Sequence, residues 1–203
     1  MTRRLVLASR NPRKLAEMRR ILGELELGNV EMVGLDAYPG LPEVTETGRT
    51  FADNALLKAR VVAASTGQPV IAEDSGLCVD ALNGMPGVRS ARWSGRQGDE
   101  RANLELLLAQ VRDVADPWRS AAFVAAAALV SPDGPEIVQE GRMEGKLIRE
   151  PRGSGGFGYD PIFVPDGQSR TSAELSAAEK DAISHRGRAL RGLAPSIVAL
   201  LGS

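Results

Sequence analysis

The N-terminal segment constrains the fold most, because an apolar run passes through a turn sequence directly into a helical pattern. Leu5–Ala8 is short and uninterrupted, which is typical of a buried strand. Turn chemistry follows in Ser9-Arg10-Asn11-Pro12. Apolar residues then return at helical spacing, as Leu15, Met18, Ile21 and Leu22. This order of strand, loop and helix predicts an α/β protein.

The rest of the chain continues to alternate between strand and helix patterns. Thr50 and Asp53 form a capping-box pattern before a helix that Gly67 closes. A turn sequence at 131–134 separates two strand patterns, so we expect a hairpin and a mixed sheet. The predicted strands are 5–8, 30–33, 69–72, 121–130, 136–143 and 162–164, and further helices are expected at 100–111, after Ser176 and after Ser184.

Length and composition narrow the class of protein. The 203 residues suffice for one substantial core, and we expect a single domain over residues 1–203. A formal net charge of −1 gives no basic field that would hold the chain on nucleic acid. The single cysteine, Cys78, excludes an internal disulfide and fits a reducing compartment. No apolar run approaches the roughly 20 residues that cross a membrane, and none reads as a signal peptide, so we expect a cytoplasmic protein without a membrane partner.

Polar residues gather where the first strand passes into the first helix. Ser9, Asn11 and Lys14 can join the free N–H groups of a helix start around a phosphate, although the spacing is not that of a Walker A motif. The alternative is an ordinary helix start, with Asn11 as its cap and Lys14 in solvent.

Four acidic residues form a second group. Glu73 and Asp74 directly follow the apolar segment 69–72, and Glu43 and Glu46 lie in the preceding loop. In open α/β sheets, ligands bind at the carboxyl ends of strands, and carboxylate oxygens suit magnesium. The alternative makes Glu43 and Glu46 solvated loop acids and Asp74 a turn former.

A glycine-rich segment offers the parts of a nucleobase pocket. Residues 153–158 allow close backbone approach, Phe157 and Tyr159 supply rings, and Asp160 supplies a carboxylate. The alternative is a flexible hairpin tip with Phe157 in the core.

Cationic residues near the last helix could bind a phosphate or a base carbonyl. Lys180 and Arg186 flank Ser184 and His185, which is the only histidine in the chain. A lone histidine near a helix start is more often structural than catalytic.

Five motifs, taken in order, resemble the inosine/xanthosine triphosphate pyrophosphatase family. They are Ser9-Arg10-Asn11-Pro12-Arg13-Lys14, Thr50-Phe51 with Asn54-Ala55, Glu73-Asp74-Ser75-Gly76-Leu77, Gly155-Gly156-Phe157-Gly158-Tyr159-Asp160-Pro161 and Ser184-His185-Arg186-Gly187. The resemblance implies an elongated α/β fold with a mixed central sheet flanked by helices, and two lobes with the active-site cleft between them. It also implies a homodimer. The implied reaction is magnesium-dependent hydrolysis of inosine, deoxyinosine and xanthosine triphosphates to monophosphate and pyrophosphate.

The resemblance also implies roles for individual residues. Asp74 would be the catalytic acceptor and a Mg²⁺ ligand, with Glu46 preferred to Glu43 or Glu73 as the second metal carboxylate. Ser9, Arg10, Asn11, Pro12, Arg13 and Lys14 would hold the triphosphate, Ser75 would contact substrate, and the base pocket would comprise Phe157, Gly158, Tyr159, Asp160, Lys180, His185 and Arg186. Two residues depart from the family pattern, since Arg10 stands where many relatives have glycine and Glu73 replaces a common aspartate.

Two alternatives to this function remain open at the level of sequence. One is a related pyrophosphatase that acts on other modified nucleotides. The other is a nucleotide sensor that binds without turnover, because a fold alone does not fix an activity.

Overall fold

The computed structural model describes residues 3–25, 27 and 29–201. Its strands are β1 (Arg3–Ala8), β2 (Val30–Gly34), β3 (Val70–Val79), β4 (Met85–Pro86), β5 (Ser120–Val130), β6 (Glu136–Leu147) and β7 (Phe163–Pro165). Its α-helices are α1 (Pro12–Gly23), α2 (Phe51–Thr66), α3 (Glu100–Gln110), α4 (Ala177–Ile183) and α5 (His185–Leu201). Short 3-10 helices occur at Leu35–Ala37, Asp80–Leu82, Gly87–Arg92, Asp116–Trp118 and Asp160–Ile162.

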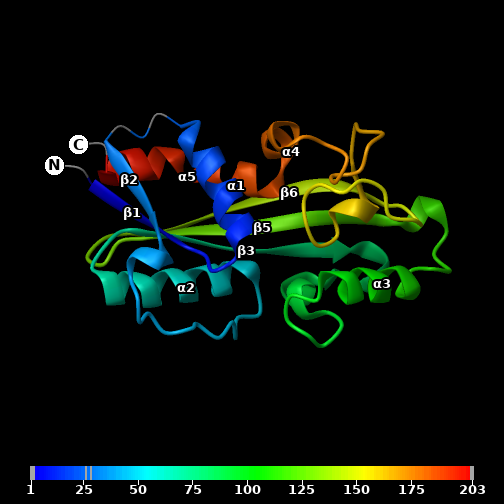
Figure 1. The fold of residues 1–203 in the computed structure, drawn as a ribbon, viewed down its shortest axis with the longest axis horizontal. Coiled ribbons are helices and arrows are strands. Elements are labelled where there is room, and N and C mark those ends of the chain that lie inside the picture. Colours follow the sequence, from blue (N-terminus) through cyan, green and yellow to red (C-terminus); the bar gives the residue numbers. More distant parts are fainter. Residues whose placement is uncertain (1–2, 26, 28, 202–203) are drawn as a thin grey trace. The chain divides into compact units, whose positions relative to one another are not determined.

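The strands form a mixed sheet flanked by helices, as the sequence predicts (Figure 1). Within the described residues its order is β2-β1-β3-β5-β6-β7, and β4 pairs with β3. β1 runs parallel to both β2 and β3, whereas β6 and β7 are antiparallel. None of the helices in the described part of the chain has the length and apolar character of a membrane span.

The chain divides into two compact units built from discontinuous segments. Unit 1 comprises Met1–Asp74, Ala125–Gly141 and Arg186–Ser203, and unit 2 comprises Ser75–Val124 and Arg142–His185. The predicted single domain over residues 1–203 and the predicted cleft between two lobes stay predictions.

Unit 1 has its own core between β1 and two helices. Leu5 and Leu7 alternate along β1 toward one face of the sheet, where they pack in a cluster with residues of α1 and α5, namely Met18, Ile21, Leu22, Leu190, Leu193 and Ile197. α1 and α5 lie on this face, and α2 lies on the opposite face (Figure 1). The spacing of apolar residues in the first helix thus predicts its buried face correctly.

Unit 2 has a second core, formed around aromatic rings. Phe123 of β5 and Phe163 of β7 meet edge to face, with ring centroids 4.8 Å apart. Leu107 of α3 and Met143 of β6 belong to the same buried cluster.

The helix starts follow the capping chemistry of the sequence. Asn11 caps α1, its side-chain oxygen accepting from the N–H groups of Arg13 (2.9 Å) and Lys14 (3.2 Å). Thr50 with Asp53 and Ser176 with Glu179 both form complete capping boxes, at α2 and α4. The predicted caps therefore fix where three helices begin.

The predicted end of the third strand at residue 72 is wrong. Parallel pairing with β1 ends at Ala8 and Ala72, but β3 continues to Val79 and pairs with β4 at Cys78 and Pro86. Glu73 and Asp74 therefore lie inside a strand, at the point where its parallel neighbour stops. The polar residues suggested a strand end because a carboxylate is rare in a buried strand unless a partner satisfies it.

Candidate functional site

Two buried acids of β3 form the centre of a charged cluster in unit 1. Glu73 is 4% exposed and Asp74 is 5% exposed. Buried carboxylates need compensating cations or donors. Lys14 of α1, Lys58 of α2 and Arg186 of α5 supply this positive charge.

Asp74 is held by two side chains of α2. Its Oδ2 accepts from Asn54 Nδ2 at 2.9 Å, and its Oδ1 lies 3.6 Å from Lys58 Nζ. Burial raises the pKa of Asp74 above its ordinary value, and Glu46 adds to this, although Lys58, Lys14 and the Asn54 hydrogen bond oppose it. A carboxylate with a raised pKa and fixed partners is suited to accept a proton.

Lys58 connects three acidic positions of the cluster. Its ammonium donates to Glu46 Oε1 at 2.7 Å and to the Glu73 carbonyl oxygen at 2.9 Å. Burial lowers the pKa of Lys58, but the charges of Asp74, Glu46 and Glu73 outweigh burial and raise it above its ordinary value. The surrounding charges therefore favour the ammonium form of Lys58.

The sequence analysis missed Lys58, although a signal was present. Lys58 follows Asn54 by one helical turn, so both side chains project from the same face of α2. The motif Thr50-Phe51 with Asn54-Ala55 identified the first turn of this helix and stopped one turn short of the lysine.

Glu73 is at the centre of a chain of ion pairs. Its Oε2 lies 3.3 Å from Lys14 Nζ, and its Oε1 accepts from Arg186 Nη2 at 3.1 Å. Lys14 is thus in an ion pair, not simply in solvent as the alternative reading had it.

Arg186 lies between two carboxylates of unit 1. The guanidinium, 1% exposed, also donates to Glu17 of α1. Burial lowers the pKa of Arg186, but Glu73 and Glu17 outweigh burial and raise it. The contacts of Arg186 with Glu73 and Glu17 compensate buried charge. Its predicted role in a base pocket stays a prediction. Glu17, one turn after Lys14 on α1, was also missed by the sequence analysis.

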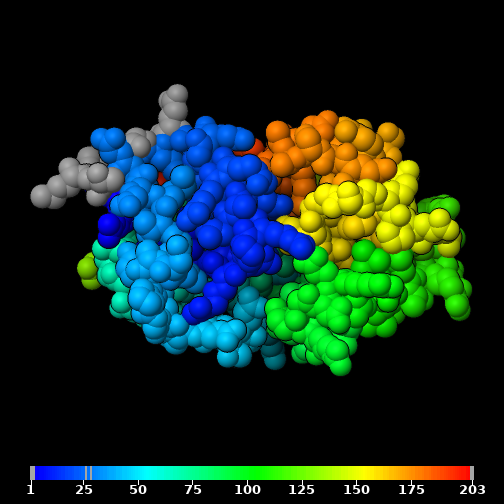
Figure 2. All heavy atoms as spheres, viewed as in Figure 1, coloured from blue at the N-terminus to red at the C-terminus, as the bar shows by residue number. Residues whose placement is uncertain are grey.

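The predicted triphosphate segment lies at the surface before and at the start of α1 (Figure 2, blue). Arg10, Asn11, Pro12 and Arg13 are exposed, and Ser9 is half-buried. Arg10 Nη2 donates to the Leu41 carbonyl oxygen at 2.8 Å, so it holds the loop that carries the other acids. Of the two loop acids, Glu43 is exposed, whereas Glu46 reaches Lys58.

The predicted base-pocket residues other than Arg186 lie in unit 2, where three of them form a second cluster. Lys180 Nζ donates to Asp160 Oδ2 at 2.6 Å in an almost fully buried ion pair. The same ammonium lies 5.0 Å from the centroid of the Phe157 ring, and Asp160 Oδ2 also accepts from the Phe157 N–H at 2.8 Å. These contacts join the segment to Lys180 of α4, and Phe157 is half-buried.

Further contacts hold the same segment in place. The Tyr159 hydroxyl donates to the Ser90 carbonyl oxygen at 2.9 Å, and the Gly158 N–H donates to Glu100 Oε2 at 3.2 Å. Gly158 has a φ of +61°, which side-chain-bearing residues rarely adopt. His185 stacks on Phe123, with centroids 5.0 Å apart, and Ser75 is half-buried on β3. The structure thus places Phe157, Asp160 and Lys180 in direct contact with one another.

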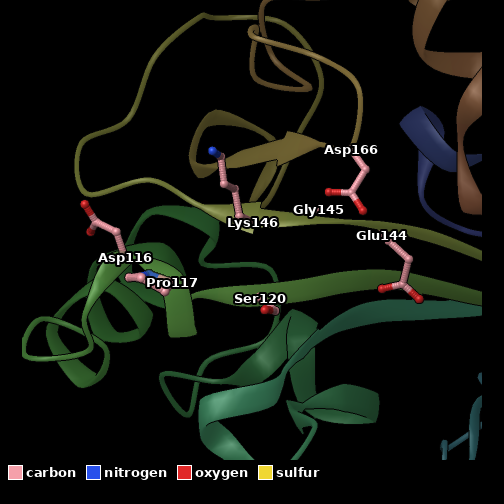
Figure 3. A pocket seen from close by; sticks show the side chains of 7 residues that line it. All are labelled: Asp116, Pro117, Ser120, Glu144, Gly145, Lys146 and Asp166. Atoms are coloured by element: carbon pink, nitrogen blue, oxygen red, sulfur yellow. The ribbon is translucent and has the colours of Figure 1, made fainter.

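A shallow pocket elsewhere in unit 2 is not the candidate site. It has a volume of about 630 Å³ and is lined by Asp116, Pro117, Ser120, Glu144, Gly145, Lys146 and Asp166 (Figure 3). Three of the seven lining residues are carboxylates, which would repel a phosphate chain.

The donor set of the first cluster suits a hard cation. Within residues 3–25, 27 and 29–201, no three His, Cys, Asp or Glu side chains converge as a ready metal cage. Magnesium does not require one, because it binds through one or two carboxylates together with substrate phosphates and water. Glu46 and Asp74 meet this condition, since both approach the same ammonium of Lys58, at 2.7 Å and 3.6 Å.

The fold and the first cluster define an α/β protein with buried carboxylates and cations of the kind that handle phosphate groups. The sequence profile of the Ham1 family matches residues 5–196, and the chain belongs to this family. The family resemblance of the motifs is thereby confirmed.

Individual relatives match over nearly their full length. A dITP/XTP pyrophosphatase of Streptomyces coelicolor is 59% identical over 199 residues, which cover 98% of this chain and 99% of the relative. The crystal structure of a nucleoside-triphosphatase/dITP/XTP pyrophosphatase from Mycobacterium abscessus is 59% identical, with a TM-score of 0.77 over 95% of this chain and 99% of that one. A HAM1 protein from Coxiella burnetii is 42% identical, with a TM-score of 0.86 over 97% of this chain and 99% of that one.

Proposed function

We propose that this protein hydrolyses dITP, ITP and XTP to the monophosphate and pyrophosphate, and so removes deaminated purine nucleotides from the nucleotide pool. The relatives named dITP/XTP pyrophosphatase support this reaction, because the identity extends over nearly the whole chain. The observation in this chain that carries the proposal is the buried carboxylate of Asp74, fixed by Asn54 at 2.9 Å and next to Lys58 at 3.6 Å.

In the proposed mechanism, Asp74 accepts a proton from a water molecule that attacks the α-phosphorus. The new bond joins the water oxygen to this phosphorus, and the bond to the bridging oxygen breaks, so that pyrophosphate leaves with the electron pair. Bound Mg²⁺, held by Asp74 and Glu46, would supply charge neutralisation at the phosphate oxygens. Lys58 and Lys14 would add positive charge beside the leaving group, and the helix start at 9–14 would hold the phosphate chain.

Base recognition is assigned to the cluster of unit 2. Hypoxanthine and xanthine carry a 6-oxo group where adenine has an amino group, so hydrogen-bond donors favour them. The segment 157–160, with Lys180 and His185, offers the Phe157 ring for stacking, the Lys180 ammonium beside it and the His185 imidazole. Ser75 and Arg186 complete the proposed substrate contacts.

The direct test is pyrophosphate release from dITP, ITP, XTP, GTP and ATP, with and without Mg²⁺. We expect rapid release from the first three substrates, slow release from GTP and ATP, and no turnover after chelation. Equal rates on all five, or undiminished turnover in chelator, would contradict the proposal. A panel of modified pyrimidine and methylated guanine nucleotides distinguishes this activity from that of related pyrophosphatases. The names of the relatives do not favour that alternative.

We further propose a cytoplasmic homodimer. The cytoplasm is where a nucleotide pool of this kind would be cleansed, and the single cysteine fits its reducing conditions. Sedimentation equilibrium checks the assembly, since a dimer has twice the 21.6 kDa mass of the chain.

A further inference from the structure

Asn54, on the first turn of α2, contacts both Asp74 and Gly48, which lies in the segment that carries Glu46. The residue is fully buried, at 0% exposed. Its Nδ2 donates to Asp74 Oδ2 at 2.9 Å, and its Oδ1 accepts from the Gly48 N–H at 2.7 Å. The two neighbours fix the orientation of the amide, because a carboxylate accepts and a backbone N–H donates.

Gly48 brings the segment that carries Glu46 against α2. A Cβ atom at Gly48 would lie 2.5 Å from Asp53 Cβ and 2.6 Å from Asn54 Oδ1, so only glycine fits this approach. The next two N–H groups, of Arg49 and Thr50, donate to Asp53 Oδ2 at 3.1 and 3.0 Å. Three successive backbone N–H groups are therefore bound by two adjacent side chains of α2.

We propose that Asn54 is a positioning residue for the reaction, which sets the Asp74 carboxylate and the Glu46 segment relative to each other. The proposal rests on the proposed function. With Oδ2 of Asp74 bound by the amide, Oδ1 is the oxygen that faces Lys58, at 3.6 Å. Glu46 reaches the same ammonium, at 2.7 Å, from the segment that Gly48 anchors. One amide thus aligns the two carboxylates that would hold the cation.

Residues that orient metal ligands usually affect metal affinity or activity by about 10- to 100-fold when they are substituted. The test compares Asn54→Leu and Asn54→Asp with the wild-type protein. Leucine has a similar size and removes both hydrogen bonds. Aspartate keeps an acceptor for the Gly48 N–H but replaces the donor to Asp74 with a repelling carboxylate, so it separates the two contacts.

Asn103 provides a matched control in unit 2. It is also a buried helical asparagine, 3% exposed, and its Oδ1 accepts from the N–H of a loop residue, Ser94, at 2.7 Å. Asn103→Leu should lower the melting temperature as Asn54→Leu does. Only the Asn54 variants should lower kcat for dITP by about 10- to 100-fold, with a smaller change in KM.

Calorimetric titration of MgCl₂ gives a readout independent of turnover. The titrated sample is the full chain with the α,β-methylene analogue of ITP, which is not cleaved. We expect weaker Mg²⁺ binding in Asn54→Leu and unchanged binding in Asn103→Leu. If kcat and Mg²⁺ affinity of Asn54→Leu lie within about twofold of those of Asn103→Leu, the positioning role is overturned.

Gly48→Ala covers the case in which the Asn54 variants do not fold. It displaces the Glu46 segment without removing the amide, so Mg²⁺ binding and kcat should both fall, and unchanged values would overturn the proposal. Wild-type protein that releases no pyrophosphate from dITP, ITP or XTP would refute the proposed function instead. The Mg²⁺ titration would then still decide the role of Asn54.

Discussion

Arg186 and Glu73 form an ion pair of 3.1 Å in which each side chain is only 1% exposed. Glu17 contacts the same guanidinium, and Lys14 lies 3.3 Å from the other oxygen of Glu73. Acidic and basic side chains therefore alternate in one buried chain of ion pairs in unit 1. The expected stabilisation is cooperative, since removing one member leaves its neighbours as uncompensated buried charges.

Arg186→Met should lower the free energy of unfolding by about 3–5 kcal/mol, because Glu17 and Glu73 lose their shared cation. Denaturant titration followed by circular dichroism measures this loss. Adding Glu17→Gln and Glu73→Gln to the variant should restore part of the stability. A triple variant as unstable as the single one would show that packing, not charge, explains the effect.

Asp74→Asn should reduce kcat by about 10²- to 10⁴-fold, because the amide keeps the size of the side chain but cannot accept a proton in the proposed way. Pyrophosphate release from dITP measures the change, and circular dichroism confirms the fold. Asp166→Asn serves as control, since Asp166 is an exposed acid of the shallow pocket. Full pyrophosphate release by Asp74→Asn would refute the role of Asp74 as the proton acceptor.

The raised pKa of Asp74 has a defined effect on stability. Protons bind this group more tightly in the folded state, so its contribution is fully present below the unfolded pKa and is lost as pH rises through the folded pKa. At neutral pH, Asp74→Asn should therefore melt at a higher temperature than the wild type, and the difference should shrink in acid. Thermal melts from pH 4 to pH 8 check this, and a lower melting temperature at pH 7 would contradict it.

Lys58→Met should leave Glu46 and Asp74 without the ammonium that separates them, so their repulsion should raise the pKa of Asp74 further. We expect a loss of turnover of about 10- to 1000-fold and a shift of the acidic limb of the pH profile toward higher pH. The pH dependence of kcat/KM measures the shift. Lys146→Met is the control, because Lys146 lines the shallow pocket of unit 2.

Glu179 should titrate far below an ordinary glutamate. Hydrogen bonds from Arg170 and from the Ser176 backbone lower its pKa to about 2. A lowered folded pKa gives stability that is present above the unfolded pKa and lost as pH falls through the folded value, here from about 4.5 to about 2. NMR titration of the Glu179 carboxyl carbon tests this, and Arg170→Gln should raise the pKa.

Local chemistry made part of this structure predictable. The caps Asn11, Thr50 and Ser176 act through side chains within three residues, so their sequence patterns predict helix starts correctly. The turn residues at 131–134 and the apolar runs on either side are also local signals, and the strands that they predict, β5 and β6, are neighbours in the mixed sheet.

The contacts that the sequence did not predict span long stretches of the chain. Glu17 meets Arg186 only because α1 and α5 pack on the same core, and Lys58 meets Asp74 only because α2 lies against β3. The course of β3 through Glu73 and Asp74 depends on partners as distant as Arg186. Such contacts join residues that are far apart in the sequence, so no local sequence pattern predicts them.

β3 carries Asp74 inside a paired strand, where side chains usually serve packing. Its backbone should therefore belong to the slowly exchanging part of the molecule, with amide protons protected by the sheet. Substitutions that adjust this site during evolution would then occur mainly around the strand, in the segment 38–50 and in the exposed turn before α1. The strand itself would be the part of the proposed site that is least free to change.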